Sequence, residues 1–283
     1  MKKHTALTIA GSDSSGGAGI QADIKTMESC GVYAMSVITA VTAQNTLGVQ
    51  GVYPMSADCV KTQLESVFTD IVPDAVKIGM LAQKELIQTT AAYLRYAGAK
   101  HIVIDPVMLS SSGTPLLERR AIECLTEELF PLAEVLTPNL PEAEALTGLR
   151  ISEAGDADVS CRSENINKAD QKRKMEEAAR ILYERYRSAV VLKGGHARGE
   201  AEDLLYLDGN CIWIAGKRVE NPNTHGTGCT FSSAIAAGLA KGMDMESSVR
   251  MAKNYMQRAI EAGLDLGKGC GPLEHGVWDG SPG

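Results

Sequence analysis

The sequence predicts an α/β protein with a central, mostly parallel sheet covered by helices on both faces. Segments with strand character alternate with segments of helical periodicity along most of the chain. The strand segments are short, nearly continuous apolar runs rich in Val and Ile, as expected of strands buried on both faces. Repeated strand–helix units of this kind form parallel sheets between helices.

The first half of the chain contains four strand–helix pairs. The predicted strands cover residues 5–11, 35–44, 75–81 and 101–107, and the helices that follow them cover 19–31, 57–70, 84–98 and 118–133. In the first helix, Ile20, Ile24 and Met27 share one face and Gly31 ends the pattern.

The second half continues the alternation. It contains predicted strands at 134–140 and 189–195, helices at 141–148 and 174–186, a strand pair within 203–216 and two last helices within 223–242 and 245–263. The strand pair is joined at Asp208-Gly209, a dipeptide typical of hairpin turns. Residues 152–172 are polar and aperiodic, so we expect a surface insertion in one domain that spans residues 1–283.

The charge, the apolar runs and the cysteines of the sequence argue against several classes of protein. The net charge is −7 and no dense basic run occurs, which argues against nucleic-acid binding. No apolar run reaches the roughly 18–20 residues that span a bilayer, and the apolar run near the N-terminus is too short for a signal peptide. The seven cysteines are widely spaced and include no C-x-x-C pair, so we expect a reduced, cytoplasmic protein.

In a parallel sheet, ligands bind beyond the carboxyl ends of the strands. Residues 11–19 (GSDSSGGAG) follow the first strand, and their glycines either let the backbone approach a ligand or simply form a flexible turn. Gln44 ends the second predicted strand. Its amide can pair with a ring nitrogen and a neighbouring amino group, or it is an exposed loop amide.

Charged residues follow three further strands. Asp105 and Glu142 are candidate Mg²⁺ ligands, although Glu142 also suits the first turn of a helix, where a carboxylate complements the dipole. Lys193 ends a later strand, where it either lies against phosphates or extends to solvent.

The stretch NTHGTGCTFSSAIAAGLAKG, residues 223–242, leads polar and glycine residues into a helix. The first amides of a helix lack internal partners, and Gly226 and Gly228 allow such amides to surround an anion. These amides are candidates for stabilising a phosphoryl group in transfer. The alternative is a glycine-rich helix entry that serves packing alone.

Taken together, these motifs resemble those of the ribokinase-like superfamily and, within its vitamin-kinase branch, the hydroxymethylpyrimidine/phosphomethylpyrimidine kinase family. The matching pieces are IAGSDSSGGAGIQADIKT, TAVTAQNT, KIGML, DPVM, LTPNLPEAEALTG, VLKGGH and THGTGCTFSSAIAAGLAKG. They occur in order through nearly the whole chain. The insertion at 152–172 is the main departure, because it is longer than the family usually has.

The resemblance implies a three-layer α/β/α ribokinase-like domain that uses ATP and Mg²⁺. It implies two phosphorylations, of 4-amino-5-hydroxymethyl-2-methylpyrimidine and then of its monophosphate, in thiamine biosynthesis. It also implies a homodimer.

The resemblance assigns roles to particular residues. Gln44 would read the aminopyrimidine edge, Met80 and Val107 would sandwich the ring, and the pocket would be shaped by Gly11, Ala18 and Asp23. Asp105 and Glu142 would serve the metal, and ATP would lie along Lys193, Thr137, Asn139 and Thr224. The anion hole would consist of Gly226, Thr227, Gly228 and Cys229.

Cys229 stands where many relatives in the superfamily have a catalytic aspartate. A helix N-terminus favours a thiolate, which could accept the proton of the substrate hydroxyl, whereas nearby phosphate raises the thiol pKa. We therefore treat Cys229 as a candidate general base. The second acceptor is a phosphate, so that step needs a base less.

Two other functions compete with this interpretation. One is a pyridoxal/pyridoxine kinase of vitamin B6 salvage, although Gln44 suits an aminopyrimidine better. The other is a non-catalytic pyrimidine-binding sensor, against which the retention of Asp105, Glu142, Lys193 and the glycine-rich turn argues.

Overall fold

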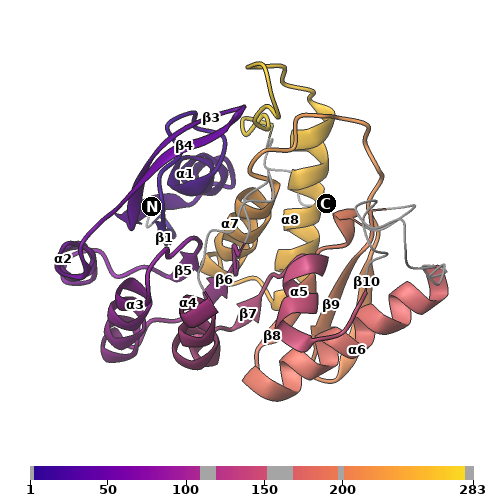
Figure 1. Ribbon diagram of the computed structural model, residues 1–283, viewed down its shortest axis with the longest axis horizontal. Coiled ribbons are helices and arrows are strands. Elements are labelled where there is room, and N and C mark those ends of the chain that lie inside the picture. Colours follow the sequence, from indigo (N-terminus) through magenta and orange to yellow (C-terminus); the bar gives the residue numbers. More distant parts are fainter. Residues whose placement is uncertain (1–2, 109–118, 152–167, 197–200, 278–283) are drawn as a thin grey trace. The chain divides into compact units, whose positions relative to one another are not determined.

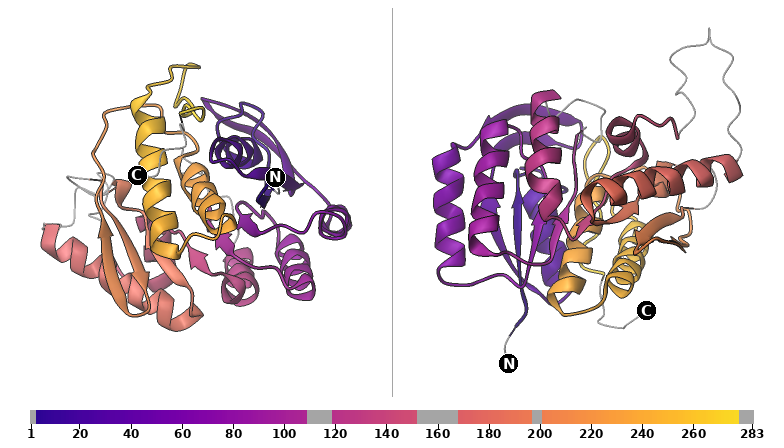
Figure 2. Two further views of the ribbon diagram at one scale, coloured as in Figure 1. Left: turned by 180° about the vertical axis from the view of Figure 1, so that it is seen from behind. Right: turned by 90° about the horizontal axis from the view of Figure 1, so that it is seen from below.

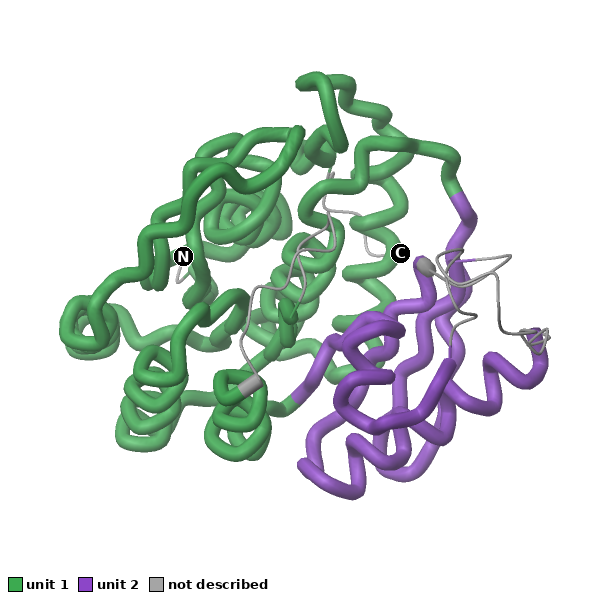
Figure 3. Tube along the Cα trace, viewed as in Figure 1, with its two compact units in different colours: residues 1–134, 219–283 green, residues 135–218 purple. Residues whose placement is uncertain are grey.

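The computed structural model describes residues 3–108, 119–151, 168–196 and 201–277. The chain forms two compact units, one of Met1–Glu134 with Val219–Gly283 and the other of Val135–Arg218 (Figure 3). Among the described residues, no helix is both long and apolar enough to cross a bilayer.

The first unit is built on parallel strands in the order β6–β5–β1–β2. Their bounds are Thr5–Ala10 for β1, Tyr33–Ile38 for β2, Ala75–Ile78 for β5 and Ile102–Ile104 for β6. All residues of β5 and β6 and nearly all of β1 are buried, as their continuous apolar runs predict.

Helices cover both faces of these strands (Figures 1 and 2). On one face α7 (Thr227–Ala240) packs against β1, β5 and β6 and contacts both α1 (Gly19–Ser29) and α8 (Met245–Glu261). The other face carries α2 (Ala57–Phe68), α3 (Lys84–Ala97) and α4 (Arg119–Cys124). After α4 the predicted helix 118–133 continues only as a π-helical turn, Leu125–Leu129, and a 3₁₀ turn, Phe130–Leu132.

The predicted strand at 35–44 is wrong in one respect, because the structure divides it at Thr39. The Thr39 amide donates to the Ala10 carbonyl (3.0 Å) and its hydroxyl donates to the Met80 carbonyl (2.8 Å). Beyond it, β3 (Ala40–Asn45) pairs antiparallel with β4 (Gly48–Pro54) as a separate two-stranded sheet. Gln44 therefore lies on this hairpin and not at the end of a main-sheet strand.

The second unit has strands in the order β7–β8–β9–β10, in which β7 pairs parallel with β8, and β9 pairs antiparallel with both β8 and β10. Their bounds are Val135–Leu136, Ala189–Leu192, Asp203–Leu207 and Asn210–Ile214. Asp208 and Gly209 have φ values of 49° and 82°, which confirms the predicted hairpin turn. A 3₁₀ turn, Gly194–His196, follows β8.

Two helices, α5 (Leu140–Thr147) and α6 (Lys168–Tyr186), complete the second unit, and α6 packs against β8 and β9. Residues 152–167 of the predicted insertion lie outside the described residues. Residues 168–172 form the start of α6, and the surface insertion itself remains a prediction. The mostly parallel α/β architecture is confirmed, whereas the single domain remains a prediction.

Candidate active site

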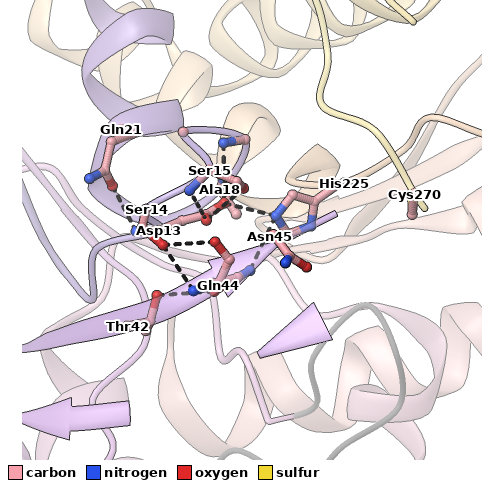
Figure 4. Close-up of polar contacts among 12 residues, drawn as sticks. Asp13, Ser14, Ser15, Ala18, Gln21, Thr42, Gln44, Asn45, His225 and Cys270 are labelled. Atoms are coloured by element: carbon pink, nitrogen blue, oxygen red, sulfur yellow. Dashed lines mark hydrogen bonds and ion pairs between the residues drawn. The ribbon is translucent and has the colours of Figure 1, made fainter. Parts of the chain in front are cut away.

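The loop after β1 folds around the carboxylate of Asp13. Its Oδ1 accepts hydrogen bonds from the amide (2.9 Å) and hydroxyl (2.7 Å) of Ser15. Its Oδ2 accepts from the amides of Gly17 (3.1 Å) and Ala18 (2.8 Å) and lies 2.8 Å from Nε2 of His225 (Figure 4). Burial alone would raise the pKa of Asp13, but hydrogen bonds from His225 and Ser15 lower it to about 2. Asp13 is therefore a buried, ionised carboxylate that organises the glycine-rich loop.

The side chain of Gln44, a residue of β3, lies beside the Asp13–His225 pair. The register between β3 and β4 shifts at Gln44, an irregularity that changes where a side chain points. The Ser14 hydroxyl bonds to both the backbone oxygen (2.7 Å) and the backbone nitrogen (2.9 Å) of Gln44. Gln44 Nε2 lies 3.2 Å from His225 Nε2, and Gln44 Oε1 lies 3.3 Å from Thr42 Oγ1 (Figure 4). The structure thus brings Gln44 beside the residue that precedes the glycine-rich turn.

That turn begins at Gly226, the N-cap of α7, which has a φ of 83°. A Cβ atom at Gly226 would collide with the carbonyl oxygen of Gly17, so only glycine fits both the backbone angle and the space. Thr227, Gly228 and Cys229 form the first turn of α7. The Thr227 amide donates to the Thr224 carbonyl (3.3 Å). Amides in a first helical turn have no partner four residues earlier, which suits them to an anion.

The thiol of Cys229 is half-buried in this turn. Burial raises its pKa to about 11; the Lys77 ammonium and a hydrogen bond with the Gly19 backbone lower it, whereas the carboxylates of Asp23 and Asp105 raise it. The thiol is therefore protonated at neutral pH. The expected preference of a helix N-terminus for thiolate is outweighed here by burial.

Asp23 lies behind these residues and is fully buried. Lys77 Nζ donates to both of its oxygens (2.9 and 2.8 Å), and the hydroxyls of Thr8 (2.5 Å) and Ser233 (2.7 Å) donate to them as well. Burial alone would lower the pKa of Lys77, but Asp23 raises it, with smaller contributions from Cys229 and Asp105. The structure does not place Asp23 among the exposed groups of the site.

Other residues assigned to the substrate also belong to the first unit. Gly11 and Met80 are in contact, because a Cβ at Gly11 would lie 2.5 Å from the Met80 Cε. Val107 has a φ of 27°, a strained value for a β-branched residue, and such strain is found mainly at functional positions. Thr224 precedes His225, and its amide lies 3.4 Å from the Cys270 sulfur.

The second unit holds the remaining nucleotide candidates. Thr137 is buried, and Lys193 is half-buried at the end of β8, with its amide donating to the Pro138 carbonyl (3.0 Å). Asn139 caps α5: its side chain accepts from the Glu142 amide (2.8 Å), and Glu142 Oε2 accepts from the Asn139 amide (2.9 Å). Glu142 therefore occupies the first turn of a helix, the alternative considered for it, and also completes a capping box with Asn139.

The two proposed metal ligands, Asp105 and Glu142, are both buried carboxylates. Asp105 follows β6 in the first unit and Glu142 lies in the first turn of α5 in the second unit, and each is 3% exposed. Buried carboxylate oxygens are hard donors of the kind that Mg²⁺ prefers, so the chemistry of these donors fits that ion.

Sequence reasoning did not single out Asp13, His225 or Lys77. A lysine within an apolar strand is a signal, because a buried charge requires a partner. The aspartate of a Gly-Ser-Asp-Ser-Ser segment is another, because such residues bond to backbone amides two positions on.

Comparisons with known proteins give matches over nearly the whole chain. Residues 13–274 match the profile of the phosphomethylpyrimidine kinase family. A hydroxymethylpyrimidine/phosphomethylpyrimidine kinase of Rhizobium meliloti is 47% identical over 274 residues, which cover 95% of this chain and 96% of that protein.

Solved structures show the same fold. A phosphomethylpyrimidine kinase of Clostridium difficile 630 is 43% identical with a TM-score of 0.76, and the match covers 91% of this chain and 100% of that one. A pyridoxal kinase of Bacillus subtilis in an ADP complex is 36% identical with a TM-score of 0.83, and the match covers 98% of each chain.

Proposed function

Because the chain belongs to the phosphomethylpyrimidine kinase family, we infer that it is an ATP-dependent hydroxymethylpyrimidine and phosphomethylpyrimidine kinase of thiamine biosynthesis. It transfers a phosphoryl group to the hydroxymethyl oxygen of 4-amino-5-hydroxymethyl-2-methylpyrimidine. It then transfers a second one to the monophosphate, which gives the diphosphate.

The observation that supports this proposal most directly is the distance of 3.2 Å between the side chains of Gln44 and His225. Gln44 offers the donor and acceptor that an aminopyrimidine edge needs. His225 directly precedes Gly226, where the anion-binding turn begins. A heterocycle held by Gln44 therefore has its reactive oxygen near the phosphoryl-binding amides.

In the proposed reaction, the hydroxymethyl oxygen attacks the γ-phosphorus of ATP and ADP leaves. The amides of residues 226–229 stabilise the charge on the transferring group. Met80 and Val107 hold the ring, Gly11 and Ala18 shape the pocket, and Asp23 supports it from within the core. The hydroxyl proton passes to Cys229 in the fraction of molecules that carry a thiolate, so this step accelerates as the pH rises.

ATP lies along Lys193, Thr137, Asn139 and Thr224 in this proposal. Asp105 and Glu142 would hold Mg²⁺, largely through water, and the ion would neutralise phosphate charge. The homodimer and the cytoplasmic location also belong to the proposal, and light scattering of the purified protein tests the first of them.

The pyridoxal kinase alternative is weaker on two grounds. The chain is 47% and 43% identical to two phosphomethylpyrimidine kinases but 36% identical to the Bacillus subtilis pyridoxal kinase. Pyridoxal also lacks the amino group beside a ring nitrogen that Gln44 would read.

The experiment is to measure ADP release with ATP and Mg²⁺ in the presence of the aminopyrimidine alcohol, of its monophosphate, of pyridoxal or of no acceptor. We expect turnover with the first two and a kcat/KM for pyridoxal at least about tenfold lower, since that ring cannot satisfy Gln44. A preference for pyridoxal, or ADP release independent of any acceptor, would contradict the proposal.

A further inference from the structure

We infer that Asp13 and His225 lock the Gln44 side-chain amide in one orientation, and that this lock makes the site select an aminopyrimidine edge over the corresponding oxo edge. The inference rests on the proposed function. It assigns Asp13 and His225 as positioning residues that act through Gln44.

The contact with Asp13 shows that His225 Nε2 carries a hydrogen. Asp13 is 2% exposed, and its two oxygens accept from Ser15, Gly17 and Ala18 as well as facing His225. A carboxylate surrounded by donors is ionised and can only accept. A lone pair on Nε2, 2.8 Å from that charge, would be repelled, so Nε2 carries a hydrogen whether His225 is neutral or charged.

The side-chain amide of Gln44 faces the same nitrogen of His225. With Nε2 of Gln44 3.2 Å from Nε2 of His225, two donors face each other. The oxygen and nitrogen of an amide are nearly equal in size, so a half-turn about the last side-chain torsion exchanges them. After that turn the Gln44 carbonyl faces the Nε2 hydrogen of His225 and shares it with Asp13 in a bifurcated hydrogen bond, and the mismatch is removed.

Thr42 requires the same orientation independently. Its hydroxyl donates to the Ser12 carbonyl at 2.7 Å, which uses its single hydrogen. It is 6% exposed and lies 3.3 Å from the other end of the Gln44 amide. Its oxygen can therefore only accept from that amide, which places the Gln44 nitrogen toward Thr42 and the carbonyl toward His225.

With its amide held in this orientation, Gln44 keeps one carbonyl lone pair and one amide hydrogen for a ligand. The carbonyl is always on the His225 side and the amide nitrogen on the Thr42 side. An aminopyrimidine edge presents a ring nitrogen that accepts and an amino group that donates. In the 4-oxo analogue the ring nitrogen donates and the exocyclic oxygen accepts. A free amide would read either edge by turning over, whereas a locked amide reads one. The ring cannot turn over instead, because its hydroxymethyl group must face the phosphoryl donor.

The test compares kcat/KM for 4-amino-5-hydroxymethyl-2-methylpyrimidine with that for its 4-oxo analogue. The wild-type protein should prefer the amino compound by at least about 100-fold, since a site built around a hydrogen-bond pattern rejects the reversed one. H225F removes the donor and T42V removes the acceptor, and each should reduce the preference to less than about tenfold. H225Q is the matched control, because its amide can still donate to both Asp13 and Gln44, and it should keep most of the preference.

Isothermal titration with each pyrimidine in the absence of ATP gives the same ratio from binding alone. Wild-type binding selectivity without turnover would contradict the proposed function but support the lock. If H225F and T42V lower kcat/KM for both compounds equally and keep the wild-type ratio, the two positions are merely structural and the inference is wrong.

Discussion

At the scale of single residues, the Cys229 thiol connects its surroundings to the chemistry most directly. It lies in the first turn of α7, close enough to Lys77, Asp23 and Asp105 for their charges to act on it, and burial raises its pKa to about 11. A thiolate with such a pKa is a strong base, but only a small fraction of the molecules carry it at neutral pH. If the Cys229 thiolate is the general base, the rate of the first phosphorylation must therefore depend on pH.

We predict that C229S lowers kcat of the first phosphorylation by about 10²–10⁴-fold and that of the second by less than about tenfold. The first rate in the wild-type protein should rise with pH, by up to about tenfold per unit at pH values below the thiol pKa, and C229S should flatten this rise. Single-turnover measurements of each step between pH 6.5 and pH 9.5 provide the check. Unchanged rates for both steps would remove Cys229 from the mechanism.

The sequence predicted site residues that directly follow strands. It did not predict residues whose role depends on contacts with distant parts of the chain. Gln44, Asp105 and Lys193 were singled out because strand ends meet at one edge of a sheet. The contact between Asp13 and His225 joins residues 212 positions apart, and no local pattern encodes such a pairing. Asp23 was assigned to the pocket with its segment, whereas the structure directs its carboxylate to Lys77 in the core.

At the scale of elements, the start of α7 depends on the loop that follows β1. Gly226 has a φ of 83° and lies against Gly17, so helix and loop meet through two glycines. Gly242, which follows the other end of the helix, has a φ of 77°, but a Cβ atom at this position would meet no other atom within 4 Å. Gly242 is therefore a matched control for Gly226.

We predict that G242A reduces the free energy of unfolding by about 1 kcal/mol, the penalty for a left-handed backbone angle alone. G226A should cost at least about 2 kcal/mol more, because the loop must also move, and should lower kcat/KM by more than about 100-fold. Urea unfolding and steady-state kinetics test this prediction. Equal losses of stability in the two variants would show that the contact with Gly17 contributes nothing.

The ion pair of Lys77 and Asp23 joins three elements of the first unit, since Lys77 is on β5, Asp23 on α1 and their partner Ser233 on α7. We predict that K77A lowers the free energy of unfolding by about 3–5 kcal/mol, because it leaves a buried carboxylate without its cation. The exposed pair of Lys61 and Glu65 is the control, and K61A should cost less than about 0.5 kcal/mol. Denaturant unfolding of the two variants gives the comparison, and equal costs would contradict it.

Element prediction succeeded where turn chemistry was explicit and failed where it was absent. Asp208-Gly209 marked the β9–β10 hairpin, and its two positive φ values explain why. The break at Thr39 has neither glycine nor proline, because tertiary hydrogen bonds to Ala10 and Met80 produce it. The predicted strand therefore ran through Thr39, and β4, the partner of the strand that carries Gln44, was not predicted.

At the scale of the whole molecule, the alternating pattern was sufficient for the fold class and the ordered motifs were sufficient for the family. Relatives that match more than nine-tenths of the chain confirm both. Whether residues 1–283 unfold as one domain depends on energetic coupling, which neither periodicity nor motifs report.

We predict a single thermal transition that moves to higher temperature with excess ATP and Mg²⁺, because a ligand that binds only the folded state stabilises it. At a concentration 100 times its Kd, the nucleotide should contribute about 2.7 kcal/mol. Scanning calorimetry with and without nucleotide tests this. Two transitions, with only one of them moved by the nucleotide, would contradict a single cooperative domain.

A crystal structure with 4-amino-5-hydroxymethyl-2-methylpyrimidine and a non-hydrolysable ATP analogue tests the proposed site most directly. We predict that the amino edge of the ring lies within hydrogen-bond distance of the Gln44 amide and that the hydroxymethyl oxygen faces the amides of residues 226–229. A pyrimidine bound out of reach of Gln44, or a γ-phosphate held away from that turn, would contradict it.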